Sequence, residues 1–235
     1  MFYVASEKKL DLQYCTFENA NLSGTWSAGS IVNINDWNDS SQVNITDCII
    51  KDNKGTAINL IAPGLYNIKN CKFLRNSSIN TEIDAAAIYV KNDDIEVNIE
   101  NCEFSESELS DVNDVYVSDI SIEEANKVTL NSCKFDSYDF SGSTKVYNVY
   151  IYKSNTLILD GNIQLPKLYF DNQYGDSNLQ ISIENNFNSS NLIEIGLSSF
   201  TSTKCLWNSS VDYSDKFVLS DESYKLNTNG SISSI

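Results

Sequence analysis

The sequence predicts an all-β fold, a right-handed parallel β-helix solenoid built of stacked coils. Three observations favour this fold. A motif with apolar residues five and three positions before a cysteine, and again two positions after it, occurs five times between residues 10 and 135. A second segment rich in Val, Ile and Tyr lies between successive copies. The spacing of the copies is irregular, which suits a solenoid because loops of different length can project from a coil without breaking the stack.

Each copy of the motif is expected to form a strand, a bend and a second strand. Val97 and Ile99 share one face of a strand. Strict alternation would place residue 101 on that face next, but the inward residue is Cys102, so the alternation shifts by one residue at this point. A residue type that tolerates a bent or left-handed backbone precedes the cysteine in four copies: Asp47, Asn70, Asn101 and Ser132. The five copies span residues 10–17, 43–50, 66–73, 97–104 and 128–135. Weaker copies follow at 157–164, 181–188 and 200–207.

The segments between the motifs are expected to supply a third strand to each coil. They span residues 57–61, 86–90, 114–118, 148–152, 167–171 and 192–196. A leucine-rich repeat is the alternative, since its strand half has the same apolar spacing as the motif. That repeat also needs a leucine three positions earlier and helix-forming return segments. The earlier position is instead occupied by Glu7, Ser40, Pro63, Asp94 and Ala125.

The predicted solenoid occupies residues 1–210, and residues 211–235 form a polar cap or linker. The opening residues contain no basic segment followed by a long apolar one, so they carry no secretory signal, and the chain can be a fragment of a longer protein. No apolar run reaches the roughly 18 residues that a membrane-spanning helix needs. We therefore expect no insertion into a membrane.

The segments Asn-Cys-Lys-Phe (70–73), Asn-Cys-Glu-Phe (101–104) and Ser-Cys-Lys-Phe (132–135), with later strands such as 86–90, resemble those of right-handed parallel β-helix repeat proteins of the pectate-lyase-like fold. Within that fold they are similar to polymorphic-membrane-protein-like and adhesin-like surface proteins. The resemblance covers about residues 10–207, although alanines at 85–87 replace the paired glycines that are frequent there. It implies an extracellular or cell-surface location and an adhesive or structural role.

The composition restricts the chemistry available to the chain. A net charge of −16 disfavours nucleic acids and anionic membranes as partners. The chain has no histidine, and Arg75 is its only arginine, so the commonest acid–base group and most bidentate anion clamps are missing. We therefore expect no catalytic residues and no cofactor. The alternative function is a carbohydrate-active β-helix, either a polysaccharide lyase or hydrolase or a phage tail-spike type.

Five cysteines hold one equivalent position of the motif: Cys15, Cys48, Cys71, Cys102 and Cys133. Equivalent positions stack in a solenoid, so we expect a structural ladder of reduced thiols that pack as small apolar side chains. Paired ligands of the Cys-x-x-Cys kind are absent, and no metal site is expected. Acidic segments at 36–39, 92–94 and 111–114 are interpreted as turns between strands.

The intervening strands place a row of tyrosines on the outside of the solenoid. If the apolar residues at 88, 90, 149 and 151 point inward, alternation turns the residues between them outward. The predicted ligand-binding stripe consists of Tyr89, Tyr116, Tyr150 and Tyr169. Its expected partners are glycans or host and cell-surface proteins, and the oligomeric state is left open. A purely stabilising ladder of stacked rings is the alternative reading.

Overall fold

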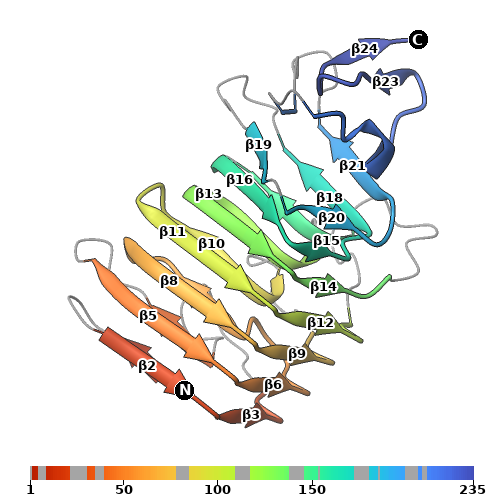
Figure 1. Cartoon of the computed structure of the whole chain (residues 1–235). Helices are drawn as coiled ribbons and strands as arrows, with labels where there is room; N and C mark the ends of the chain where they lie inside the picture. The colour runs from red at the N-terminus through yellow and green to blue at the C-terminus, as the bar shows by residue number, and fades with distance from the viewer. Residues whose placement is uncertain are drawn as a thin grey trace.

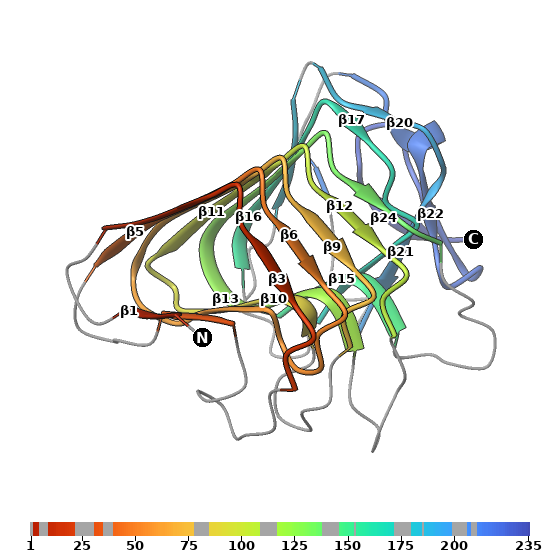
Figure 2. The same ribbon diagram turned by 90° about the horizontal axis from the view of Figure 1, so that it is seen from below.

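A computed structural model describes residues 2–4, 9–21, 31–34, 40–77, 85–108, 117–137, 146–152, 154–171, 180–184, 186–198, 206–207 and 211–235. The described chain is a parallel β-solenoid with its coils stacked from the N- to the C-terminus (Figure 1). In Figure 2 the chain turns clockwise as it recedes from the viewer, which is the right-handed sense. The predicted fold class is confirmed.

A 3-10 turn at Ser214–Lys216 is the only helical element in the described ranges, so the leucine-rich repeat alternative is wrong. The return segments that would be helical in that repeat are strands here, because they are rich in β-branched and aromatic residues. No helix in the part of the chain that the structure covers is long and apolar enough to cross a membrane.

Parallel pairing builds three sheets, one for each side of the coil. Sheet A contains β1 (Phe2–Val4), β4 (Val32–Ile34), β7 (Ile58–Leu60), β10 (Ala85–Lys91), the first part of β13 (Val117–Asn131), β15 (Val146–Ile151), β18 (Lys167–Phe170), β21 (Ile193–Leu197) and β22 (Phe217–Leu219). Sheet B contains β2 (Lys9–Gln13), β5 (Ser41–Thr46), β8 (Gly64–Lys69), β11 (Ile95–Glu100), the rest of β13, β16 (Ser154–Asp160) and β19 (Gln180–Ile183).

Sheet C forms the third side. It contains β3 (Thr16–Glu18), β6 (Ile49–Lys51), β9 (Lys72–Leu74), β12 (Glu103–Ser105) and β14 (Lys134–Phe135). Farther along the stack, β17 (Asn162–Ile163) pairs with β20 (Asn188–Ser189). Each motif therefore supplies one strand of sheet B and one of sheet C, and the intervening segments supply sheet A, as the sequence indicated.

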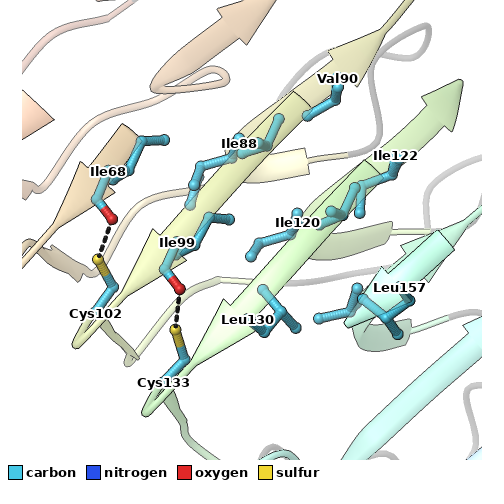
Figure 3. Packing of buried hydrophobic residues seen from close by; sticks show 14 of the residues in the cluster. Ile68, Ile88, Val90, Ile99, Cys102, Ile120, Ile122, Leu130, Cys133 and Leu157 are labelled. Carbon is cyan, nitrogen blue, oxygen red and sulfur yellow. Dashed lines mark hydrogen bonds between the residues drawn. The ribbon is translucent and has the colours of Figure 1, made fainter. Parts of the chain in front are cut away.

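The coils are stacked in register, so equivalent residues lie beside one another. Val97 of β11 pairs with Tyr66 of β8 on one side and with Val128 of β13 on the other. The rings of Phe73, Phe104 and Phe135 form a parallel stack in the core, with centroids 4.8 and 4.6 Å apart. Figure 3 shows further apolar side chains of sheets A and B packed in the interior beside Cys102 and Cys133.

The corner between sheets B and C is left-handed at every predicted position. The φ angles are +55° at Asp47, +54° at Asn70, +51° at Asn101 and +53° at Ser132. Tyr14 and Gly161 occupy the same corner in other coils with φ of +56° and +67°. A second left-handed row was not predicted. It lies four positions after the cysteine, at Asn19, Asp52, Arg75 and Glu106.

The two ends of the solenoid differ. Sheet A continues past residue 210, where we expected the solenoid to end, because β22 pairs in parallel with β21. An antiparallel hairpin of β23 (Tyr224–Leu226) and β24 (Ile232–Ser234) then follows at the C-terminal end. At the N-terminal end, Cys15 and Phe17 are only half-buried, whereas their equivalents Cys48 and Ile50 in the next coil are buried.

Candidate functional site

Three tyrosines of the predicted ligand-binding stripe are described, and they lie on the outer side of sheet A, but two of them are covered. The residues that flank them, such as Ile88 and Val90, belong to the core, so the predicted alternation is present. Tyr89 is nevertheless only 2% exposed and Tyr169 only 7%. Tyr150 is half-buried, and Tyr116 lies outside the described residues. The prediction of an exposed stripe is therefore wrong for Tyr89 and Tyr169.

Contacts along the sheet cover Tyr169. The ring of Tyr169 lies 4.6 Å from that of Tyr147 and 5.7 Å from that of Tyr150. The Nζ of Lys167 lies 5.0 Å from the centre of the Tyr147 ring. The hydroxyl of Tyr150 donates to Asp171 Oδ2 at 3.1 Å. Stacked and hydrogen-bonded tyrosines of this kind stabilise neighbouring coils, so sheet A fits the structural alternative better than a binding surface.

Four cysteines of the motif lie in the core with unpaired thiols, and Cys15 is half-buried in the first coil. Each buried sulfur lies near the carbonyl oxygen of the residue three positions before the cysteine of the preceding coil. The contacts are Cys48 to Leu12 at 3.7 Å, Cys71 to Ile45 at 3.4 Å, Cys102 to Ile68 at 3.5 Å and Cys133 to Ile99 at 3.3 Å. Burial raises the pKa of Cys48 to about 11 and that of Cys133 to about 12. The thiols of Cys48 and Cys133 are therefore poor nucleophiles.

Arg75 is engaged in ion pairs rather than placed as a base. Its guanidinium makes two hydrogen bonds to the carboxylate of Asp52, at 2.6 and 3.0 Å, and lies 3.6 Å from Glu106. These hydrogen bonds lower the pKa of Asp52 and raise that of Arg75. Both partners sit in the second left-handed row, so the ion pair links adjacent coils at that corner.

The acidic segment at 92–94 forms a turn. Asn92 is buried, accepts a hydrogen bond from the Asp94 amide at 2.9 Å and donates one to the Ile61 carbonyl at 3.0 Å. The segments at 36–39 and 111–114 lie outside the described residues. Within the described ranges, no three His, Cys, Asp or Glu side chains group as a metal site would require.

The outer face of sheet B carries a continuous row of hydrogen-bonded side chains, which we call the amide row. It consists of Asp11, Asn44, Asn67 and Asn98 on β2, β5, β8 and β11. Each amide nitrogen donates to the side-chain oxygen of the preceding coil, at 2.5, 3.0 and 3.0 Å along the row. The in-phase register of the strands creates this row, because it sets equivalent residues directly beside one another.

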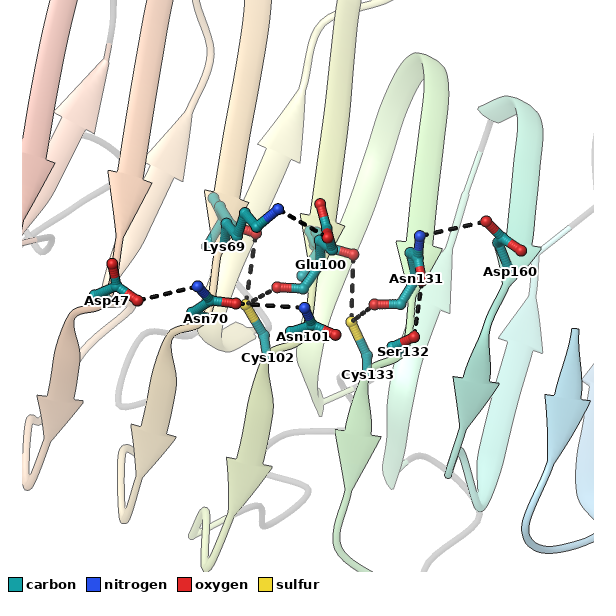
Figure 4. Close-up of polar contacts among 12 residues, drawn as sticks. Asp47, Lys69, Asn70, Glu100, Asn101, Cys102, Asn131, Ser132, Cys133 and Asp160 are labelled. Carbon is teal, nitrogen blue, oxygen red and sulfur yellow. Dashed lines mark hydrogen bonds and ion pairs between the residues drawn. The ribbon is translucent and has the colours of Figure 1, made fainter. Parts of the chain in front are cut away.

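A shallow groove of about 290 Å³ follows the amide row. Its lining comprises Asn44, Thr46, Asn67, Ile68, Lys69, Asn98 and Glu100. The ion pair between Lys69 and Glu100, 2.9 Å long, lies along one side of it (Figure 4). A second hydrogen-bonded row runs along the neighbouring corner, with Asn70 donating to Asp47 at 3.0 Å and Asn101 donating to Asn70 at 3.4 Å.

The chemistry of this groove is polar and nearly neutral. An asparagine side chain has two N–H donors and an oxygen with two lone pairs, and the row uses one donor of each amide. The charges of Lys69 and Glu100 compensate each other, although the whole chain carries −16. The groove can therefore exchange hydrogen bonds with an uncharged polar ligand. The sequence contained a signal for it, since asparagine precedes the cysteine by four positions at residues 44, 67 and 98.

No family model, curated protein or solved structure matches this chain. The coarse prediction of a parallel β-solenoid is established by the strand pairing itself.

Proposed function

We propose that this chain is a non-catalytic extracellular surface or adhesive module, and that the outer face of sheet B binds neutral, hydroxyl-rich glycans. The amide row and the groove along it carry this proposal. Amide donors and acceptors on a rigid sheet are well suited to hydroxyl groups, because desolvating a neutral amide or hydroxyl costs far less than desolvating a charged group.

The periodicity of the row supports an extended ligand. Adjacent strands are spaced by about 4.8 Å, so the same amide recurs at that interval along the solenoid axis. An extended polysaccharide presents hydroxyl groups at a comparable repeat. A ligand lying along the axis would meet Asn44, Asn67 and Asn98 in succession, and its affinity would build up from several modest contacts.

Charge favours a neutral ligand over an acidic one. The net charge of −16 repels a polyanionic chain at long range. The single arginine, the residue best suited to clamp a carboxylate, is paired with Asp52 at a different corner. Lys69, the cation on the groove, is paired with Glu100.

The proposal is tested with the full chain on a panel of neutral and acidic polysaccharides, by titration calorimetry and by assay for new reducing ends. We expect binding to a neutral polysaccharide, no release of reducing ends, and loss of at least tenfold in affinity in the double variant Asn67→Ala/Asn98→Ala, which is about 1.4 kcal/mol.

Asn188→Ala is the matched control, because Asn188 is exposed and bonds Asn162 of the neighbouring coil at 3.4 Å, away from the groove. Its binding should equal that of the unaltered chain. Preference for acidic polysaccharides, or equal binding by the double variant, would contradict the assigned surface. Release of reducing ends would show catalysis.

A further inference from the structure

The C-terminal hairpin meets the last coil at Gly230. The Gly230 carbonyl accepts a hydrogen bond from the Leu206 amide at 2.9 Å, and the Leu206 carbonyl accepts one from the Ile181 amide at 2.8 Å. Gly230 has φ of +80°, and a Cβ there would lie 2.6 Å from the Trp207 carbonyl oxygen and 2.7 Å from its ring carbons. Trp207 itself is buried and packs on Phe217, with ring centroids 5.0 Å apart. The last coil therefore lies directly against the main chain at residue 230 and leaves no room there for a side chain.

The residue before Gly230 is an exposed asparagine whose side-chain carbonyl is polarised. Asn229 Oδ1 accepts one hydrogen bond from the Ser231 amide at 3.1 Å and another from the Ser231 hydroxyl at 2.7 Å. Two donors on one carbonyl oxygen draw electron density from Cγ and stabilise negative charge on that oxygen during attack. Asn229 is thus an activated electrophile that water can reach.

The nucleophile is the next main-chain nitrogen. Asn229–Gly230 is the only Asn-Gly pair in the sequence, and a glycine has no side chain to hinder ring closure onto the preceding asparagine. The Gly230 N–H donates to the Asn227 carbonyl at 2.9 Å, so the nitrogen becomes available only when this bond of the hairpin loop opens.

We propose that Asn229 is a site of spontaneous deamidation, and that its conversion undocks the C-terminal hairpin from the last coil. The Gly230 nitrogen loses its proton to solvent and bonds to Asn229 Cγ. The Cγ–Nδ2 bond breaks, and ammonia leaves with a proton from water. Water then opens the resulting succinimide at either carbonyl and gives aspartate or isoaspartate at position 229. The net reaction consumes one water and releases one ammonia.

The product does not fit the site that the asparagine occupied. Isoaspartate adds one methylene to the main chain immediately before Gly230, where a shift breaks the hydrogen bond from Leu206 and the packing on Trp207. Either product also adds a negative charge to a chain that already carries −16. The hairpin then exposes the apolar end of the solenoid.

The full chain is incubated at neutral and at mildly alkaline pH and followed by peptide mapping and hydrogen-exchange mass spectrometry. We expect Asn229 to convert several-fold faster than Asn188, an exposed asparagine followed by serine, and faster at the higher pH because the nitrogen must be deprotonated. Amides of residues 206–207 and 224–234 should exchange faster in the converted protein.

Asn229→Gln keeps the amide but closes a less favourable ring, and should retain slow exchange throughout the incubation. Asn229→Asp reports the effect of the charge without the added methylene. Conversion of Asn229 no faster than that of Asn188 would overturn the proposal, and so would complete conversion with unchanged exchange in the hairpin.

Discussion

The outer faces of sheets A and B obey the same alternation but differ in what covers them. In sheet A, outward residues such as Asn59 and Tyr89 are buried. In sheet B, the corresponding outward residues, such as Asn67 and Lys69, are half-buried or exposed. Period-two alternation therefore determines the side of the sheet to which a residue points, but it does not determine whether that side meets solvent. Only the second property decides which face can bind a ligand.

The largest effect should come from the inner side of sheet B. Ile99→Asp places an unpaired carboxylate in the core, which costs several kcal/mol and should abolish cooperative unfolding in urea. Asn98→Asp, one residue away on the outer side, should leave cooperative folding intact. Equal behaviour of the two variants would invalidate the assignment of inner and outer faces.

A smaller effect separates a covered tyrosine from an exposed one. Tyr169→Ala should lower the free energy of unfolding by about 3 kcal/mol, because a buried ring and its contacts with Tyr147 and Tyr150 are lost. Tyr14, which is 76% exposed, is the control, and Tyr14→Ala should change that free energy by about 0.5 kcal/mol or less. If urea titrations gave comparable losses of unfolding free energy for the two variants, Tyr169 would be as exposed as Tyr14.

Two asparagines allow the covered face of sheet A and the open face of sheet B to be compared with the same residue type. Asn59 in sheet A is fully buried and donates to Asn33 at 3.2 Å, so Asn59→Ala should lower the unfolding free energy by about 2 kcal/mol. Asn67→Ala in sheet B should lower it by only about 0.5–1 kcal/mol, because water can replace its bonds. A larger loss at Asn67 would reverse the assignment of covered and open faces.

The smallest effect concerns the thiols inside the corner that borders sheet B. Burial favours the neutral form of Cys133 and raises its folded pKa to about 12 from the ordinary value of 9.0. Its contribution to stability is therefore complete below pH 9 and is lost as pH rises toward 12. At pH 10 the loss amounts to about 1 kcal/mol. Cys133→Ala should remove this part of the pH dependence of the unfolding free energy, measured by chemical denaturation. If the variant loses as much unfolding free energy between pH 9 and 10 as the unaltered chain, the Cys133 thiol is not fully buried.

The sequence was sufficient to predict the solenoid, its three strands per coil and the left-handed corner before the cysteine. All of these depend on local patterns: alternation, a phase slip and residues such as Asn70 and Asn101 that accept positive φ. The second corner was missed because Arg75 and Glu106 have no intrinsic preference for that conformation. Stacking on the neighbouring coil holds them there through hydrogen bonds such as that from the Arg75 amide to the Ser105 carbonyl.

The burial of two predicted site residues was missed for a related reason. Burial of Tyr89 and Tyr169 depends on contacts between segments distant in sequence, which an alternation pattern does not contain. The amide row depends on the register between coils, which the aligned motifs did specify. The asparagines at 44, 67 and 98 could have indicated a hydrogen-bonded ladder, but asparagine is equally frequent in turns.

The uniform corner has a consequence for how a gene of this kind can change in length. Asn70 and Asn101 enter the corner with nearly the same φ and lie 31 residues apart. An unequal crossover that removes residues 71–101 would join Asn70 directly to Cys102 and leave the motif reading Ile-Lys-Asn-Cys-Glu-Phe. The junction would lie at the left-handed corner, where the two coils already have the same backbone conformation. Whole coils could therefore be lost or duplicated without producing a chain that fails to fold.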